Sequence, residues 1–514
     1  MNRLRQFIYN GLLLTAVSVL MRSVGVSYNV YLSNKIGAVA MGLFTLISTV
    51  YGFAITLATS GIGLATTRLV AQALGKDDQG GRSEAVRYTV RKCVGYSLLF
   101  SALATILLYV LAPDIGISLL KDERTVRPMQ ILALTLVPIS LSSVLTGYFV
   151  AVRRVYKNAL TQIVGQGVKI YASVLLLGSV FGSGIESACI AVAVSGILSE
   201  GISLSIQMIF YWLEKKKQKE KSLSVPEKRK IQKELWNTAL PVALSAYVRS
   251  GLITVEHMLI PRGLVKSGAS RDLSLAAYGI VHSMVFPLVL FPSALSSSFA
   301  GLLIPEVAQA QAGQDTKKIE RMIQKVFSCV LTYAIGTAGI LMCFAYPLAN
   351  VIYPDTEAGK YILMISPLIP VMYLDTSTDA FLKGMGEQFY CMVVNIVDAL
   401  LSVILVWILL PRMGITGYIV TVYFTEIVNA ALSIARLLYV AKVRIRWFSW
   451  LVRPLLCIAA STLSSAFLIR ILHITVNSAL CLTVQILLCV AIYLLLITLF
   501  VRKNNFSLSF SVHE

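Results

Sequence analysis

The chain has 514 residues, of which 57% are hydrophobic and 14% are charged. A mean hydropathy of +0.76 excludes an ordinary soluble globular protein, in which about 25% of residues are charged. The apolar runs are longer than strands and lack two-residue alternation, which excludes a membrane β-barrel. The net charge of +20 fits the lysine and arginine bias of cytoplasmic loops, and we expect no nucleic-acid partner.

The chain opens on an apolar run, residues 12–32, that carries Arg22 near its middle. An arginine at that depth costs at least ~2.5–3.5 kcal/mol on insertion scales, so it needs water, a partner or a substrate. A second run, residues 240–260, carries Arg249 at the same depth, again followed by a serine. The pair predicts a central cavity that accepts an anionic group; the alternative is an ion pair with a buried carboxylate.

About fourteen transmembrane helices are expected along the chain. They lie near residues 8–32, 38–67, 94–112, 129–151, 159–181, 187–212, 236–260, 275–304, 326–350, 360–382, 391–411, 415–440, 450–472 and 478–501. Lysine and arginine gather in alternate connections, which predicts that both termini are cytoplasmic. The protein is therefore expected to be a multi-pass protein of a bacterial cytoplasmic membrane.

Four regions follow from the charge pattern. Residues 1–212 form an N-terminal lobe of six helices, and residues 236–440 form a C-terminal lobe of six. Between them, residues 213–235 are a basic cytoplasmic linker, for which anionic membrane lipids are a second expected partner. Residues 441–514 hold two further helices and a cytoplasmic tail.

The two lobes show signs of an internal repeat. Val70-Ala71-Gln72-Ala73 recurs as Val307-Ala308-Gln309-Ala310, and Gly147 recurs as Gly384 at the same offset. Each lobe has an even number of spans, so the repeats have the same orientation. This predicts a parallel repeat about an axis along the membrane normal.

Short motifs distributed in order along the chain resemble one known family. They are Tyr31-Leu32-Ser33, Ile36-Gly37-Ala38, Gly147-Tyr148-Phe149, Ile260-Pro261-Arg262 and Gly384-Met385-Gly386-Glu387-Gln388. The chain resembles the polysaccharide-transporter and stage V sporulation protein B group of the multidrug/oligosaccharidyl-lipid/polysaccharide exporter superfamily. It departs from the family pattern at Thr146 and Gly165, where an arginine and a glutamate are usual. Tyr28 and Gly42 replace cationic residues of the lipid II flippases, which favours the sporulation-type branch.

The resemblance implies an alternating-access flippase for an isoprenoid-diphosphate-linked saccharide or a peptidoglycan precursor. Such a protein would act in cell-wall or spore-cortex synthesis, with cell-wall enzymes as possible partners. Arg22, Arg249 and Lys169 are the candidate substrate-binding residues, because arginine's planar fork suits phosphate oxygens. For each of them the alternative is an ion pair with a carboxylate such as Glu200 or Glu256.

Most intramembrane carboxylates lie in the second half of the chain, including Asp375 and Asp379. The resemblance implies coupling to Na⁺, protons or membrane potential, with Glu256, Asn395, Asp398 and Glu426 as candidates. A sodium ion would bind at Glu256, Asn395 and Asp398, since oxygen ligands suit a hard cation. The alternative is a set of structural hydrogen bonds.

The sequence contains no Walker-type loop, nucleophile elbow or HExxH motif, which indicates a secondary transporter and not an enzyme. Its eight cysteines form no CxxC pair, so we expect structural thiols and no cofactor. Two other functions stay open. One is a cation-coupled multidrug exporter of the same superfamily, and the other is a scaffold for cell-wall or spore-coat enzymes.

Overall fold

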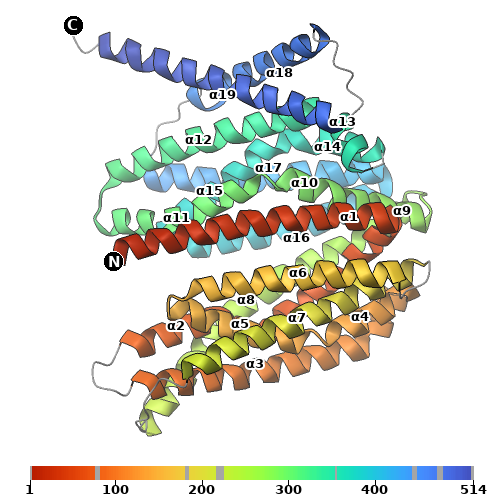
Figure 1. Cartoon of the computed structure of the whole chain (residues 1–514), viewed down its shortest axis with the longest axis vertical. Helices are drawn as coiled ribbons and strands as arrows, with labels where there is room; N and C mark the ends of the chain where they lie inside the picture. Colours follow the sequence, from red (N-terminus) through yellow and green to blue (C-terminus); the bar gives the residue numbers. More distant parts are fainter. Residues whose placement is uncertain are drawn as a thin grey trace. The chain divides into compact units, whose positions relative to one another are not determined.

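The computed structural model describes residues 3–75, 82–179, 184–215, 225–353, 356–442, 448–471 and 479–510. These residues form helices and no strand (Figure 1). The α-helices are α1 (Arg3–Thr59), α2 (Ile62–Gly75), α3 (Arg82–Pro113), α4 (Val126–Ala133), α5 (Leu136–Ala151), α6 (Val155–Ser179), α7 (Ile185–Lys215), α8 (Val225–Lys266), α9 (Arg271–Gly279), α10 (Phe286–Leu290), α11 (Ser293–Ala312), α12 (Thr316–Cys343), α13 (Ala345–Ile352), α14 (Thr356–Ile365), α15 (Ile369–Gly384), α16 (Gln388–Met413), α17 (Ile415–Ala441), α18 (Arg453–Ile471) and α19 (Ala479–Phe510).

The described helices confirm the predicted all-α, multi-pass membrane protein. Eleven of them are long and apolar enough to cross a membrane, and the number rises to twelve if the bent pair α4–α5 counts as one span. Helices are the expected solution, because every backbone N–H and C=O in lipid must be satisfied within the segment. The count of fourteen stays a prediction, as do the lobe boundaries. The predicted linker lies partly outside the described residues.

The first helix is interrupted at Gly37. This residue has φ 79° and ψ 170°, a backbone conformation that glycine adopts and other residues rarely do. α1 covers 57 residues, far more than the ~20 needed for one crossing. The break at Gly37 therefore separates two of the predicted spans, the first of which contains Arg22.

The chain folds into two compact units. The first unit comprises residues 1–24 and 36–279, and the second comprises residues 25–35 and 280–514. The segment Gly25–Lys35 of α1 thus belongs with the second unit, although the residues on both sides of it belong with the first. Its contact there is a hydrogen bond from Asn34 Nδ2 to the carbonyl of Ile352, at 3.1 Å.

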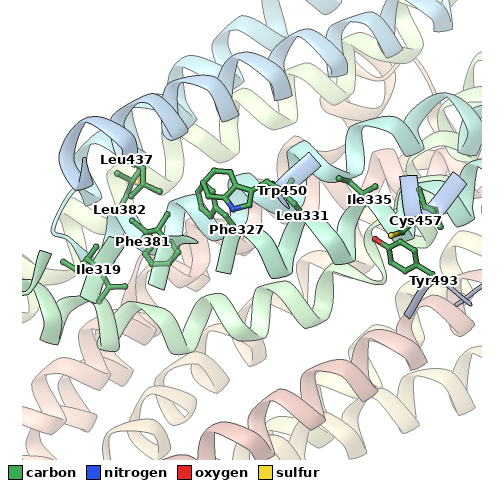
Figure 2. Close-up of a cluster of buried hydrophobic side chains, with 14 of the residues drawn as sticks. Ile319, Phe327, Leu331, Ile335, Phe381, Leu382, Leu437, Trp450, Cys457 and Tyr493 are labelled. Carbon is green, nitrogen blue, oxygen red and sulfur yellow. The ribbon is translucent and has the colours of Figure 1, made fainter. Parts of the chain in front are cut away.

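Each unit has an apolar core of its own. In the first unit, buried residues of α2, α3, α5 and α8 meet around Cys93, Tyr96 and Phe149. In the second unit, Phe327 of α12 packs against Phe381 of α15 and against Trp450, with ring centroids 6.3 and 5.4 Å apart (Figure 2). The same cluster extends to Cys457 and Tyr493 of α18 and α19.

Equivalent glycines make equivalent contacts in the two units. A Cβ on Gly147 of α5 would lie 2.5 Å from the carbonyl oxygen of Gly63 in α2. A Cβ on Gly384 of α15 would lie 2.8 Å from Val307 in α11. In both units a glycine therefore allows close approach of one helix to the helix that carries the Val-Ala-Gln-Ala motif. This agrees with the predicted repeat.

Candidate functional site

The two intramembrane arginines both belong to the first unit. Arg22 lies on α1 and is half-buried, whereas Arg249 lies on α8 and is exposed. The ion pairs found among the described residues involve neither arginine. Within this part of the chain, neither guanidinium is therefore neutralised by a carboxylate of the protein.

Arg249 does not take part in the contact between α8 and α1. Thr56 Oγ1 bonds to Ser250 Oγ at 3.2 Å, and the Tyr247 hydroxyl bonds to Ser60. Successive residues of an α-helix are turned by about 100°. The side chain of Arg249 is therefore turned about 100° from Ser250 and about 160° from Tyr247, so it projects away from the part of α1 that follows Gly37.

Lys169 has a different environment. It lies on α6, half-buried, and its charge interacts with that of Glu200 on α7. Glu200 also acts on Tyr51, whose hydroxyl bonds to Thr135. Lys169 thus has a carboxylate nearby, as the alternative interpretation of this residue expected.

Carboxylates from three helices of the second unit lie near one another. Asp375 of α15, Asp398 of α16 and Glu426 of α17 are close enough for their charges to repel. Asn429 Nδ2 donates to Asp375 Oδ2 at 3.2 Å. The other oxygen, Asp375 Oδ1, is buried and has no hydrogen-bond partner among the described residues. Carboxylates this close favour protonation of one of them, because like charges repel.

Two other predicted coupling residues, Asn395 and Glu256, make different contacts. Asn395 Nδ2 donates to the carbonyl of Cys391 in its own helix, at 2.6 Å. Glu256 belongs to the first unit, where its charge acts on Tyr278. The described residues hold no group of three or more His, Cys, Asp or Glu side chains arranged to bind a metal.

Of the three carboxylates in this group, Asp375 was not among the coupling residues predicted from the sequence. Its spacing from Asp379 places two carboxylates one helical turn apart within an apolar run, which is an unusual pattern. The structure separates their roles, because Asp379 Oδ2 accepts a hydrogen bond from Lys383 Nζ at 2.7 Å. Of the two carboxylates, Asp379 forms an ion pair with Lys383, whereas Asp375 takes part in none of the ion pairs among the described residues.

A buried carboxylate, Asp122, lies in the connection between α3 and α4 and is paired with two arginines. Asp122, 4% exposed, accepts hydrogen bonds from Arg124 Nη2 at 2.8 Å and from Arg271 Nε at 3.3 Å. Arg124 also contacts Asp272 at 3.1 Å. Burial alone would raise the pKa of Asp122, but hydrogen bonds and charge from Arg124, together with Arg271, outweigh burial and lower the pKa. The cluster fastens this connection to the start of α9.

A second buried pair lies where α7 ends. Lys157 Nζ, on α6, donates to Glu214 Oε1 at 2.5 Å, and both side chains are 10% exposed. Arg154 Nη1 and the Tyr148 hydroxyl also donate to Glu214, at 2.7 and 2.9 Å. The ammonium of Lys157 lies over the ring of Phe149 as well. Every charge in this cluster therefore has a partner within the protein.

Comparison with known proteins gives a consistent result. The model of the family described as "Polysaccharide biosynthesis protein" matches residues 7–311, and the MatE model matches residues 266–408. The chain is 25% identical over 419 residues to Stage V sporulation protein B of Bacillus subtilis (strain 168), which covers 80% of this chain and 79% of that protein. It is 23% identical over 422 residues to Lipid II flippase MurJ of the same organism, covering 76% and 75%.

Solved structures share the fold. The structure described as "Lipid II flippase MurJ, inward closed conformation" superposes with a TM-score of 0.69 at 14% identity. The match covers 96% of this chain and 99% of that one. An inward-facing multidrug resistance MATE family transporter of the MOP superfamily superposes with a TM-score of 0.61 at 16% identity, covering 84% and 100%.

Proposed function

The chain belongs to the polysaccharide biosynthesis protein family, and from this premise we propose that it flips an isoprenoid-diphosphate-linked saccharide or a peptidoglycan precursor across the bacterial cytoplasmic membrane. The chain is a multi-pass membrane protein of a superfamily of flippases and transporters. Enzymes of cell-wall synthesis are the proposed protein partners.

The observation that carries the proposal is that the guanidinium groups of Arg22 and Arg249 are not paired with a carboxylate in the part of the chain that the structure describes. Neither takes part in an ion pair among the described residues, although both lie in apolar helices. A bare diphosphate in the membrane interior would be prohibitively costly. Two guanidinium groups offset that cost while the headgroup is bound, because each can donate two parallel hydrogen bonds to phosphate oxygens. Lys169, beside Glu200, is the weaker candidate of the three.

The test is transport by the purified full-length protein in vesicles loaded with an undecaprenyl-diphosphate-linked sugar. Arg22→Ala or Arg249→Ala should reduce flipping at least tenfold while leaving expression unchanged. Arg→Lys should restore little, since lysine keeps the charge but lacks the planar fork. Arg412→Ala, at the exposed end of α16, is the matched control and should transport normally.

Two results would overturn the proposal. Normal flipping by the Arg22→Ala/Arg249→Ala double variant would remove the arginines from the mechanism. Export of organic cations in place of the lipid-linked sugar would favour the alternative function, a multidrug exporter. The match of the MatE model to residues 266–408 of this chain is the observation behind that alternative.

We also propose that Asp398 and Glu426, together with Asp375, bind the coupling cation. The support is their mutual repulsion, which a bound proton or Na⁺ would relieve. Glu426→Gln and Asp398→Asn should uncouple transport from the ion gradient, whereas Glu306→Gln, exposed on α11, should not. Equal shifts of the melting temperature by Na⁺ and by pH in wild type and in both variants would place the coupling elsewhere.

The membrane orientation is likewise a proposal, with both termini cytoplasmic. Its support is the distribution of basic residues in the connections. On a cysteine-free background, an impermeant thiol reagent added to intact cells should label Ser267→Cys but not Gln314→Cys. The reverse pattern would invert the orientation.

A further inference from the structure

One tyrosine near the start of α3 lies beside two ammonium groups. Lys92 Nζ of α3 lies 5.6 Å from the centroid of the Tyr88 ring, and Lys228 Nζ of α8 lies 5.9 Å from it. Both distances are within the range of a cation–π interaction. Tyr88, Lys92 and Lys228, here called the Tyr88 site, all belong to the first unit. They bring two like charges to one ring from helices far apart in sequence.

The two helices run in register beyond this site. Trp236 of α8 packs against Tyr96 of α3 with ring centroids 5.0 Å apart. Trp236 follows Lys228 by eight residues, and Tyr96 follows Tyr88 by eight residues. At 1.5 Å per residue, Trp236 lies about 12 Å along α8 from Lys228, and Tyr96 lies about 12 Å along α3 from Tyr88. This is the order found at a membrane surface, where cations lie at the headgroups and tryptophan and tyrosine lie one layer deeper.

In the part of the first unit that the structure describes, the lysines of the Tyr88 site differ from Lys157 and Lys169 in taking part in no interaction with a carboxylate. Lys157 is paired with Glu214, and Lys169 interacts with Glu200. Among side chains that the structure describes, no ion pair involves Lys92 or Lys228. Arg91 and Arg229 are the sequence neighbours of Lys92 and Lys228, and both are exposed. The site therefore carries positive charge that an external anion can neutralise.

The surface that continues from the site is apolar. On α3, Leu99 is 59% exposed, and on α8, Leu240 is 47% exposed. Trp236, 38% exposed, lies between Lys228 and Leu240 along α8. A hydrocarbon-compatible surface therefore lies about 16–18 Å along the helices from an anion at the Tyr88 site, within reach of an acyl chain. A phospholipid has both parts, whereas free phosphate has only the first.

We propose that the Tyr88 site binds the phosphate headgroup of an anionic phospholipid, with the acyl chains lying along the exposed leucines of α3 and α8. The inference does not depend on the proposed flippase activity, because it concerns binding at one end of the first unit. Each basic residue near an anionic lipid surface contributes about 1 kcal/mol. Removal of both lysines should therefore weaken binding about thirtyfold.

The test is a lipid titration of the full-length protein in neutral detergent, followed by its melting temperature and by native mass spectrometry. Phosphatidylglycerol should raise the melting temperature more than phosphatidylcholine does. Lys92→Gln/Lys228→Gln should shift the midpoint of the phosphatidylglycerol titration about thirtyfold. The matched control is Lys230→Gln/Lys233→Gln, which removes the same charge from exposed positions of α8 and should shift it less than threefold.

The ring provides a second, independent measurement. Tyr88→Phe keeps the aromatic face and should bind as wild type, whereas Tyr88→Leu keeps both lysines but should bind several-fold more weakly. Equal weakening in the control double variant would mean general attraction by a basic surface and would overturn the site. Equal protection by glycerol phosphate at the same concentration would overturn the lipid as ligand. Wild-type binding by Lys92→Gln/Lys228→Gln would overturn both.

Discussion

The two ends of α3 differ in how their charges are neutralised. Near its first turns, Lys92 shares the ring of Tyr88 with Lys228, and no carboxylate pairs with either lysine among the described side chains. Beyond its last turn, the buried carboxylate of Asp122 bonds to Arg124 and Arg271. The first end carries charge that is open to an external partner, whereas the second holds its charges in a closed internal cluster.

This contrast separates two uses of charge in one membrane protein. A closed cluster fixes a connection and should matter equally in every lipid, since its partners are part of the chain. An open cluster should contribute little to stability until an anion binds. Arginine and lysine counts alone do not distinguish the two, because both kinds lie near the ends of apolar helices.

The largest effect is expected from Asp122→Ala. This substitution leaves Arg124 and Arg271 without the carboxylate they share, and breaking a buried pair typically costs 3–5 kcal/mol. Because both arginines are about one-third exposed, we expect a loss of about 2–3 kcal/mol in the free energy of unfolding. Denaturation in detergent should show the same loss with phosphatidylglycerol as with phosphatidylcholine. Asp114→Ala, at an exposed position, is the control. If the loss in Asp122→Ala depended on the lipid, the two ends of α3 would not differ in how their charges are neutralised.

A smaller effect is expected at the other closed cluster. Glu214→Gln keeps an acceptor for Tyr148 but removes the charge opposite the buried Lys157. The loss should be about 1–2 kcal/mol, since hydrogen bonds to charged groups exceed neutral ones by about that much. Glu186→Gln is the control, because its partner Arg127 is 76% exposed and 3.8 Å away and such pairs contribute ~0–1 kcal/mol. Equal losses in the two variants would show that burial of Lys157 does not make its pair stronger.

The smallest effect depends on pH. The pKa of Asp122 is lower in the folded protein than its ordinary value of 3.8. A carboxyl with a lowered folded pKa stabilises the protein above its unfolded pKa, and that contribution is lost as the pH falls through the folded value. The difference in melting temperature between wild type and Asp122→Asn should therefore be constant from pH 7 to 5 and shrink below about pH 4. A difference that already shrinks between pH 7 and 6 would identify another titrating group.

The sequence predicted the fold class well because hydropathy and span length follow from bilayer thickness. The repeat stays a prediction, with which the close contacts of Gly147 to α2 and of Gly384 to α11 agree. The break at Gly37 could be suspected only from the residue type. That residues 25–35 group with the second unit could not be predicted, because hydropathy carries no information on which helices pack together.

The polar residues were harder to predict. Sequence spacing placed Asn395 and Asp398 on one face of a helix, and both lie on α16, where the amide of Asn395 donates to the carbonyl of Cys391. The carboxylates that do approach Asp398 come from α15 and α17, at distances in sequence that no local pattern reveals. Lys169 could not be distinguished from Arg22, because its proximity to Glu200 depends on how α6 packs on α7. Local periodicity therefore indicates a face, and tertiary packing decides the partner.

The division of the first helix has a consequence for the order of synthesis. Residues 25–35 are made early, yet they belong with the second unit, and Asn34 bonds to Ile352, which is 318 residues further along the chain. At about 5–20 residues per second, roughly 15–60 s separate the two during translation. For that time the segment of the nascent chain lacks its final neighbour. The amide of Asn34 then needs water or lipid headgroups as a temporary partner until the later half of the protein is inserted.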